Sequence, residues 1–154
     1  MIEKMILSAV KKAPTREVAT RLARNTLSNH GFTTFDQEEF DVLGVKSSGI
    51  RVIIKFWIKP SKKPVPKFYI KKFDKSIQDF VIRNDLQGDV HAFIIANTPL
   101  DTDAYRYYKE FARFSMKLIF TANDIKAQLK HMKEENHPGV EKFEQKALVE
   151  FISA

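Results

Sequence analysis

Alternating side chains predict a β-strand over residues 50–58. Successive residues of a strand point to opposite faces of a sheet, so the two sets of alternate positions are sorted onto two surfaces. One surface is wholly apolar and carries Val52, Ile54, Phe56 and Ile58. The other surface mixes cationic and apolar side chains and carries Arg51, Ile53, Lys55, Trp57 and Lys59. The strand should therefore bury its first surface and present charge on its second.

Apolar residues at helical spacing predict helices on either side of this strand. A first helix begins at Ile2 and ends before Pro14, and a second is capped by Thr15 and stops at Gly31. Three further helices are expected to open at Asp74 and end near Gly88, to run from Ala104 to Ser115 with Tyr108, Phe111 and Ala112 inward, and to cover 140–151.

Three further segments are predicted to be strands. Phe40 to Val45 precedes the turn at Ser47–Gly49, and Val90–Ala96 and Lys117–Phe120 are short apolar runs. The last two strands, with the helix between them, form a βαβ unit with parallel strands. We expect one α/β domain over 1–154, with a mixed central sheet of about four to five strands flanked by helices. Its core should span 15–129, with an extra helix at the N-terminus and a helical extension over 130–154.

Positive charge is concentrated in one part of the chain. The formal net charge is +7, and the segment from Val42 to Phe73 contains nine Lys and Arg residues without a carboxylate, so the remainder sums to −2. Aromatic residues lie among these charges, which favours a surface for nucleic acid, with phosphates on the cations and bases or sugars on the rings. The alternative is a solvated lysine-rich loop around Pro60, Pro64 and Pro66. The residues expected to contact nucleic acid are Arg51, Lys55, Trp57, Lys59, Lys62, Lys63, Lys67, Lys71 and Lys72.

Other kinds of site have little support. The chain has no cysteine, which excludes disulfides and thiolate metal sites and suits a reducing compartment. The four histidines lack metal-binding spacing, and His91 is expected to be a hydrogen-bonded core residue. No apolar run approaches the ~20 residues of a membrane span, and the start lacks the features of a signal peptide. We therefore expect a cytoplasmic protein that does not enter membranes.

Three segments resemble the PD-(D/E)XK restriction-endonuclease-like superfamily, particularly its archaeal Holliday-junction resolvases and Mrr-type endonucleases. They are residues 15–32, 39–45 and 51–59. The resemblance implies a nuclease-like core with Mg²⁺ held by Asp41 and Glu17, a further acid and a lysine on strand 50–58, a homodimer, and double-stranded or branched DNA as the partner.

The chain departs from that family where the second acid belongs. One alignment places Lys55 at the acid position and Trp57 at the lysine position, and the other places Ile53 at the acid and Lys55 at the lysine. Neither supplies the oxygen ligand that Mg²⁺ needs. We therefore assign no catalytic residue, treat Glu17, Asp41 and Lys55 as relics, and expect a lysine to pair with Asp41 where the metal would sit. For Glu17 the simpler interpretation is an ion pair with Arg21 on a solvated helix face.

Three functions remain open. The first is a nucleic-acid-binding protein on a nuclease-like fold that has lost its metal-dependent catalytic site, with DNA as the favoured partner. The second is an active Mg²⁺-dependent endonuclease whose missing carboxylate has migrated to Glu38, Glu39, Asp74 or Asp79. The third is a non-enzymatic interaction module whose basic strip meets an acidic protein or a membrane surface. Whether the protein is an enzyme is open, with the balance toward no.

Overall fold

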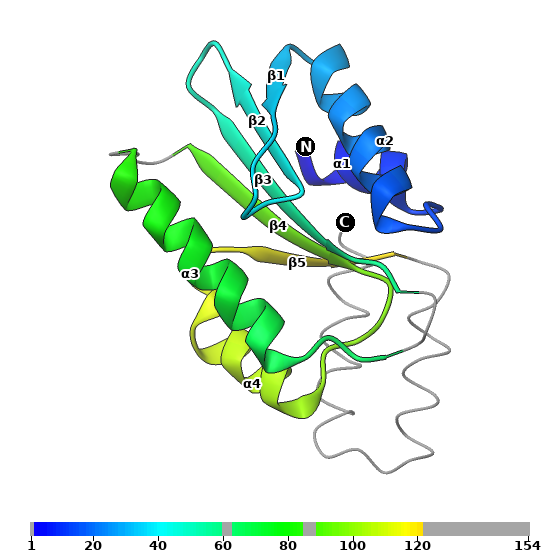
Figure 1. The fold of residues 1–154 in the computed structure, drawn as a ribbon, viewed down its shortest axis with the longest axis vertical. Coiled ribbons are helices and arrows are strands. Elements are labelled where there is room, and N and C mark those ends of the chain that lie inside the picture. The colour runs from blue at the N-terminus through cyan, green and yellow to red at the C-terminus, as the bar shows by residue number, and fades with distance from the viewer. Residues whose placement is uncertain (1, 60–62, 85–88, 122–154) are drawn as a thin grey trace.

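The computed structural model describes residues 2–59, 63–84 and 89–121, and within them helices cover both faces of a five-stranded sheet (Figure 1). The helices are α1 (Ile2–Val10), α2 (Arg16–Asn29), α3 (Lys67–Arg83), α4 (Thr102–Glu110) and the short 3₁₀ helix η1 (Ala112–Phe114). The strands are β1 (Phe32–Phe35), β2 (Val42–Lys46), β3 (Arg51–Trp57), β4 (Val90–Ala96) and β5 (Lys117–Phe120).

The sheet is mixed, as the sequence predicts. Its order is β1-β2-β3-β4-β5; β1, β2 and β3 pair antiparallel, whereas β3, β4 and β5 pair parallel. The expected parallel pairing of β4 with β5 is therefore confirmed, and β3 with α3 and β4 forms a second parallel unit. The α/β class and the flanking helices are also confirmed, and β1 is an edge strand that the sequence pattern left unassigned.

The two surfaces of β3 belong to two separate cores. Ile54 and Phe56 pack with buried residues of α1 and α2, whereas Ile53 and Trp57 pack with those of α3 and α4. Figure 1 shows these helix pairs on opposite faces of the sheet. The alternation along β3 is thus confirmed, and it fixes which helices each β3 side chain can meet.

Local signals set both ends of α2. The Thr15 side chain accepts a hydrogen bond from Val18 N at 3.2 Å, so it caps the first turn as predicted. Gly31 follows the helix with φ of +87°, a conformation that a side chain makes costly. The helix packs closely against β2 at Gly44. A Cβ atom at this position would lie only 3.1 Å from Leu27 Cδ1.

The expected start of α3 is wrong. The helix begins at Lys67 and not at Asp74, so Asp74 lies in its third turn with an exposed fraction of 3%. Its carboxylate accepts hydrogen bonds from Tyr107 Oη at 2.8 Å, from Ser115 Oγ and from Gln78 Nε2 at 3.1 Å. This buried network joins α3 to α4 and η1.

Two further expectations are also wrong. The helix expected from Ala104 to Ser115 is divided into α4 and η1, which leaves Phe111 57% exposed, although Tyr108 and Ala112 are buried as predicted. His91 is exposed near the start of β4 and is not a core residue. The helix expected over 140–151 lies outside the described residues, and the division of the chain at residue 129 stays a prediction. None of the helices in the described part of the chain is long and apolar enough to cross a membrane.

Candidate functional site

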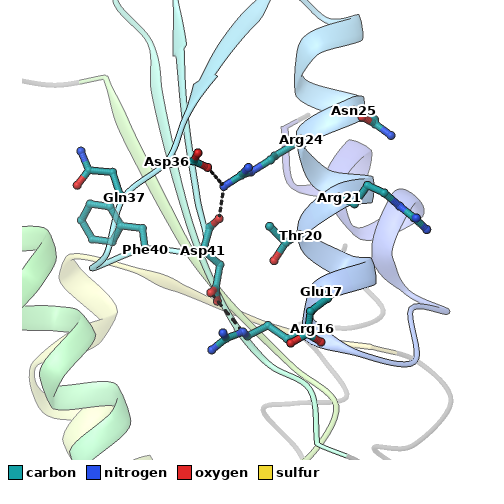
Figure 2. A pocket seen from close by; sticks show the side chains of 10 residues that line it. All are labelled: Arg16, Glu17, Thr20, Arg21, Arg24, Asn25, Asp36, Gln37, Phe40 and Asp41. Carbon is teal, nitrogen blue, oxygen red and sulfur yellow. Dashed lines mark hydrogen bonds and ion pairs between the residues drawn. The ribbon is translucent and has the colours of Figure 1, made fainter.

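A cavity of about 490 Å³ lies between α2 and the turn that leads from β1 into β2 (Figure 2). It brings together Glu17 and Asp41, the two acids that the resemblance implies as metal ligands. Arginines of α2 share the cavity with them, and Asp36 lies on the turn side. The charged residues of its lining are Arg16, Glu17, Arg21, Arg24, Asp36 and Asp41.

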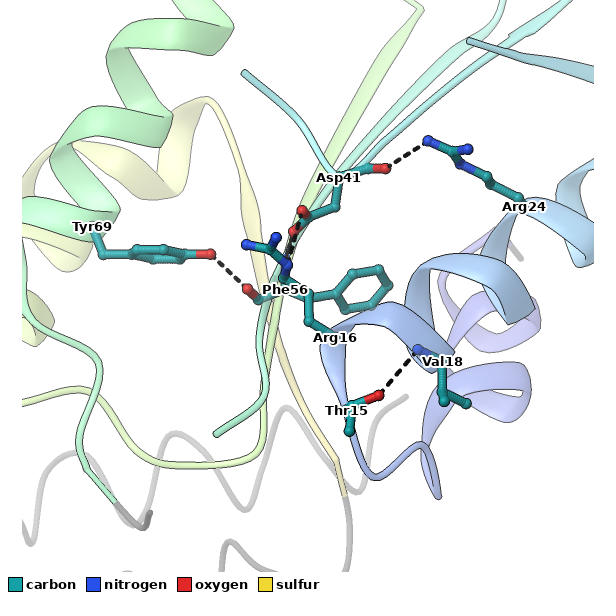
Figure 3. Close-up of polar contacts among 7 residues, drawn as sticks. All are labelled: Thr15, Arg16, Val18, Arg24, Asp41, Phe56 and Tyr69. Carbon is teal, nitrogen blue, oxygen red and sulfur yellow. Dashed lines mark hydrogen bonds and ion pairs between the residues drawn. The ribbon is translucent and has the colours of Figure 1, made fainter. Parts of the chain in front are cut away.

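Asp41 is the most constrained of these acids. Its side chain is 9% exposed, and its Oδ2 accepts a hydrogen bond from Phe56 N at 2.7 Å (Figure 3). Its Oδ1 lies 3.6 Å from Arg16 Nε. An ion pair therefore forms at Asp41 as expected, but the partner is an arginine of α2 and not a lysine of β3. Nothing in the sequence near Asp41 points to Arg16; only the packing of α2 beside β2 brings it there.

Arg24 fixes the other side of the cavity. Its Nη2 lies 2.7 Å from Asp36 Oδ1 and donates to the backbone oxygen of Asp41 at 3.4 Å. Its Nε is buried without a hydrogen-bond partner, and both contacts of the guanidinium are made by Nη2 (Figure 2). Two of the three carboxylates in the cavity are thus already paired with guanidinium groups.

The side chains around Asp41 do not fit a divalent cation. Mg²⁺ requires several oxygen ligands in near-octahedral geometry, but the β3 residues on this face of the sheet are apolar and buried, with Ile54 and Phe56 nearest. Lys55 projects from the opposite face, so it cannot complete a site with Asp41. Among residues 2–59, 63–84 and 89–121, no three His, Asp or Glu side chains gather closely enough to hold a metal ion.

The acids named as possible migrated ligands do not join Asp41. Glu39 Oε2 lies 3.0 Å from Arg83 Nη2, and Asp74, on α3, is enclosed by its own hydrogen bonds. Glu38 and Glu39 line a different cavity, and Asp79 is exposed on α3.

Lys55 lines that second cavity, which has a volume of about 430 Å³ and lies on the α3 side of the sheet. Tyr69 also lines this cavity and is held in place by two contacts. Its hydroxyl donates to Phe56 O at 2.5 Å, and its ring packs edge-on against Trp57 with ring centres 4.7 Å apart. Burial, and then the nearby Asp41 carboxylate, raise the pKa of Tyr69, so it stays a neutral donor. Lys55 Nζ lies 5.8 Å from the centre of this ring, within the range of a cation–π contact.

Three of the nine cationic residues of the basic segment lie on α3 and not in a loop. Lys67, Lys71 and Lys72 are exposed on this helix, and Lys75, which follows the buried Asp74, extends the same surface. We call the exposed lysines of α3, Lys67, Lys71, Lys72 and Lys75, the lysine face. The sequence analysis missed Lys75 because it ended the basic segment before Asp74; the spacing of Lys67, Lys71 and Lys75 by four residues would have revealed it.

The remaining predicted contact residues are spread along β3 and beyond it. Arg51 and Lys59 are eight residues apart, or about 26 Å along an extended strand, and Arg51 Nη1 donates to Gly49 O at 3.0 Å. Lys59 Nζ lies 4.7 Å from the centre of the Trp57 ring, and Lys63 is exposed. Lys62 lies outside the described residues.

Trp57 is a core residue. Its exposed fraction is 6%, and its Nε1 donates to Lys63 O at 3.2 Å. Almost none of the ring is therefore accessible to a base. Phe56 and Phe73 are buried as well, with exposed fractions of 1% and 2%, whereas Phe68 is 69% exposed.

Comparison with known proteins adds two similar structures. No family model and no curated protein matches this chain. A repair endonuclease from Pyrococcus abyssi is 13% identical, with a TM-score of 0.41, over 79% of this chain and 46% of that one. A structure of an EndoMS complex with double-stranded DNA has the same identity, TM-score and coverage of this chain, and 45% of its own length is matched. This chain thus spans less than half the length of either structure.

Proposed function

We propose that this protein binds nucleic acid, with double-stranded or branched DNA as the first candidate, through the lysine face and Lys55. It does so without metal-dependent cleavage. The observation that carries the proposal is the placement of four exposed lysines on one side of a single helix. Phosphates are bound by such clusters because each neutralised phosphate releases condensed counterions.

The charge on α3 also runs against local helix stability. Its first turn contains Lys67 and no acidic residue, although the positive end of the helix dipole favours acids there. A polyanion lying along the face would offset this repulsion.

Absence of cleavage is proposed because of what surrounds Asp41. Arg16 supplies positive charge where a cation would bind, and the Phe56 amide occupies one carboxylate oxygen. Lys55 lies on the opposite face of the sheet from the cavity lined by Asp41. We therefore assign it to the phosphate contacts and not to a catalytic role.

The salt dependence of binding tests the proposal. In Lys67→Ala/Lys71→Ala/Lys75→Ala, the slope of log K against log salt for a DNA duplex should fall by about 0.9 for each lost phosphate contact, or about 2.7 in all. Fluorescence anisotropy of labelled duplex over a salt series measures it.

The matched control is Lys4→Ala/Lys11→Ala/Lys12→Ala. These lysines are exposed at α1 and just after it, so the control removes the same charge from another surface. It should keep the wild-type slope. An equal fall of the slope in both triple variants would show that net charge and not the lysine face governs binding. An unchanged slope in both would remove the lysine face from the interface, and either result would overturn the proposed surface.

A further inference from the structure

The second cavity is lined by an exposed aromatic ring and by two lysines. Phe68 lies in the first turn of α3 and lines the cavity with Lys55 and Lys72. Its exposed fraction of 69% leaves ring surface open to solvent. A single exposed apolar residue is common on proteins and means little alone, so the significance of Phe68 rests on its neighbours.

These neighbours give the cavity one cationic and one acidic end. Lys55 and Lys72 accompany Phe68, whereas Glu38 and Glu39 come from the turn before β2. Glu39 is held 3.0 Å from Arg83, the last residue of α3, so the acids lie toward the far end of the helix from Phe68. A phosphate chain is therefore favoured beside Phe68 and opposed near the glutamates.

The floor of the cavity is rigid. Tyr69 is bound to the backbone of β3 through its hydroxyl, and Phe73, 2% exposed, packs edge-on against Phe40 with ring centres 6.0 Å apart. The volume of about 430 Å³ falls within the range of about 300–1,000 Å³ that is usual for small-ligand sites.

We infer that this cavity receives an unpaired base, which stacks on Phe68 while Lys55 and Lys72 bind the flanking phosphates. The inference rests on the proposed function and specifies its ligand. A paired base keeps its faces against its neighbours in the duplex, so a protein ring can stack on it only where the base is unpaired. The shared chemistry is an unpaired base with its phosphates, whether in a single strand or at a junction.

Phe68→Ala tests the inference. Its affinity for a single-stranded oligothymidine of about 12 nucleotides should fall about fivefold to 150-fold, the range for loss of one base–aromatic stack. Phe68→Tyr should bind like wild type, because a tyrosine ring stacks equally well. The salt slope should not change in Phe68→Ala, since no phosphate contact is removed.

Two controls separate stacking from general damage. Phe114→Ala removes a ring that is 77% exposed on η1, outside the cavity, and should bind like wild type. An oligonucleotide with abasic sites in place of thymidines keeps the phosphates but has no bases, and Phe68→Ala should bind it as tightly as wild type does. If Phe68→Ala weakened the abasic strand as much as the thymidine strand, the stacking role would be overturned.

Duplex probes distinguish the source of the base and separate this inference from the proposed function. A blunt duplex should bind wild type and Phe68→Ala equally, and a duplex with a single-stranded extension should lose affinity in the variant. Tighter wild-type binding to the extended duplex than to the single strand would assign the ligand to a junction; equal binding would assign it to free strand. Binding of all probes without any effect of Phe68→Ala would overturn the inference alone, whereas no binding at low salt would overturn the proposed function too.

Discussion

Asp41 supports the fold through two contacts of one carboxylate. Its carboxylate completes the hydrogen bonding of Phe56 N and neutralises Arg16 at the same time. The next peptide unit is held by Tyr69, whose hydroxyl donates to the Phe56 carbonyl (Figure 3). Two successive peptide units of β3 are thus fixed by side chains from outside the strand.

Substitution of Asp41 should reveal which of these contacts matters more. Asp41→Ala leaves the Phe56 amide without its acceptor and should lower the free energy of unfolding by about 1–3 kcal/mol. Asp41→Asn keeps an oxygen for that amide and should cost less. Arg16→Ala should cost about 0–1 kcal/mol, because the Arg16 side chain is 54% exposed and the pair is solvated. Urea unfolding measures all three; an equal loss in Asp41→Asn and Asp41→Ala would mean that charge, and not the amide contact, dominates.

At the scale of elements, α3 illustrates why the sequence misleads. Pro66 precedes the helix without a side-chain cap, and the first turn is cationic, so the first acid that resembles an N-cap is Asp74. Burial of Ile70 and Phe73, with exposed fractions of 0% and 2%, outweighs those signals. The strands β2 to β5 and the helix α2 were predictable because periodicity and capping there agree with burial.

The candidate site was predictable only in part, for a related reason. Composition located the concentration of positive charge, but whether Trp57 or Phe68 is accessible depends on where α3 lies over β3. The partner of Asp41 likewise depends on α2, because Arg16 precedes Asp41 by 25 residues and the two side chains meet only after folding.

The contact between α3 and α4 should depend on pH through Tyr107. Burial, and then its hydrogen bond to Asp74, raise the pKa of Tyr107 to about 12, from an ordinary value of about 10. Folding therefore favours the protonated phenol, so its contribution to stability is complete below about pH 10 and is lost as the pH rises through about 12. Tyr107→Phe should lower the free energy of unfolding at neutral pH by about 1–2 kcal/mol and flatten the alkaline decline.

Urea unfolding across this alkaline range measures the effect, with Ser115→Ala, which removes another donor to Asp74 but no phenol, as the control. The control should retain the alkaline decline of the wild type. An unchanged decline in Tyr107→Phe would assign it to other groups and remove the hydrogen bond to Asp74 from the account.

For the whole molecule, the central expectation is that DNA is bound and left intact. Supercoiled, branched and single-stranded DNA incubated with Mg²⁺ or Mn²⁺ should stay uncut, because the groups around Asp41 do not supply the ligands of a divalent cation. Gel electrophoresis measures this, with a restriction enzyme as the positive control. Cleavage by the wild type that is abolished in Asp41→Asn, the variant that retains the amide contact, would establish the endonuclease alternative instead.

On the proposed function, the acidic turn beside α3 would also limit how far a bound polymer extends. A strand that followed the helix from Lys67 would meet Glu38 and Glu39 toward the Arg83 end, and repulsion would turn it out into solvent. The molecule would then grip a few nucleotides at a terminus or a bend and could not travel along a continuous filament. Such a footprint suits recognition of interruptions in DNA better than the coating of long stretches.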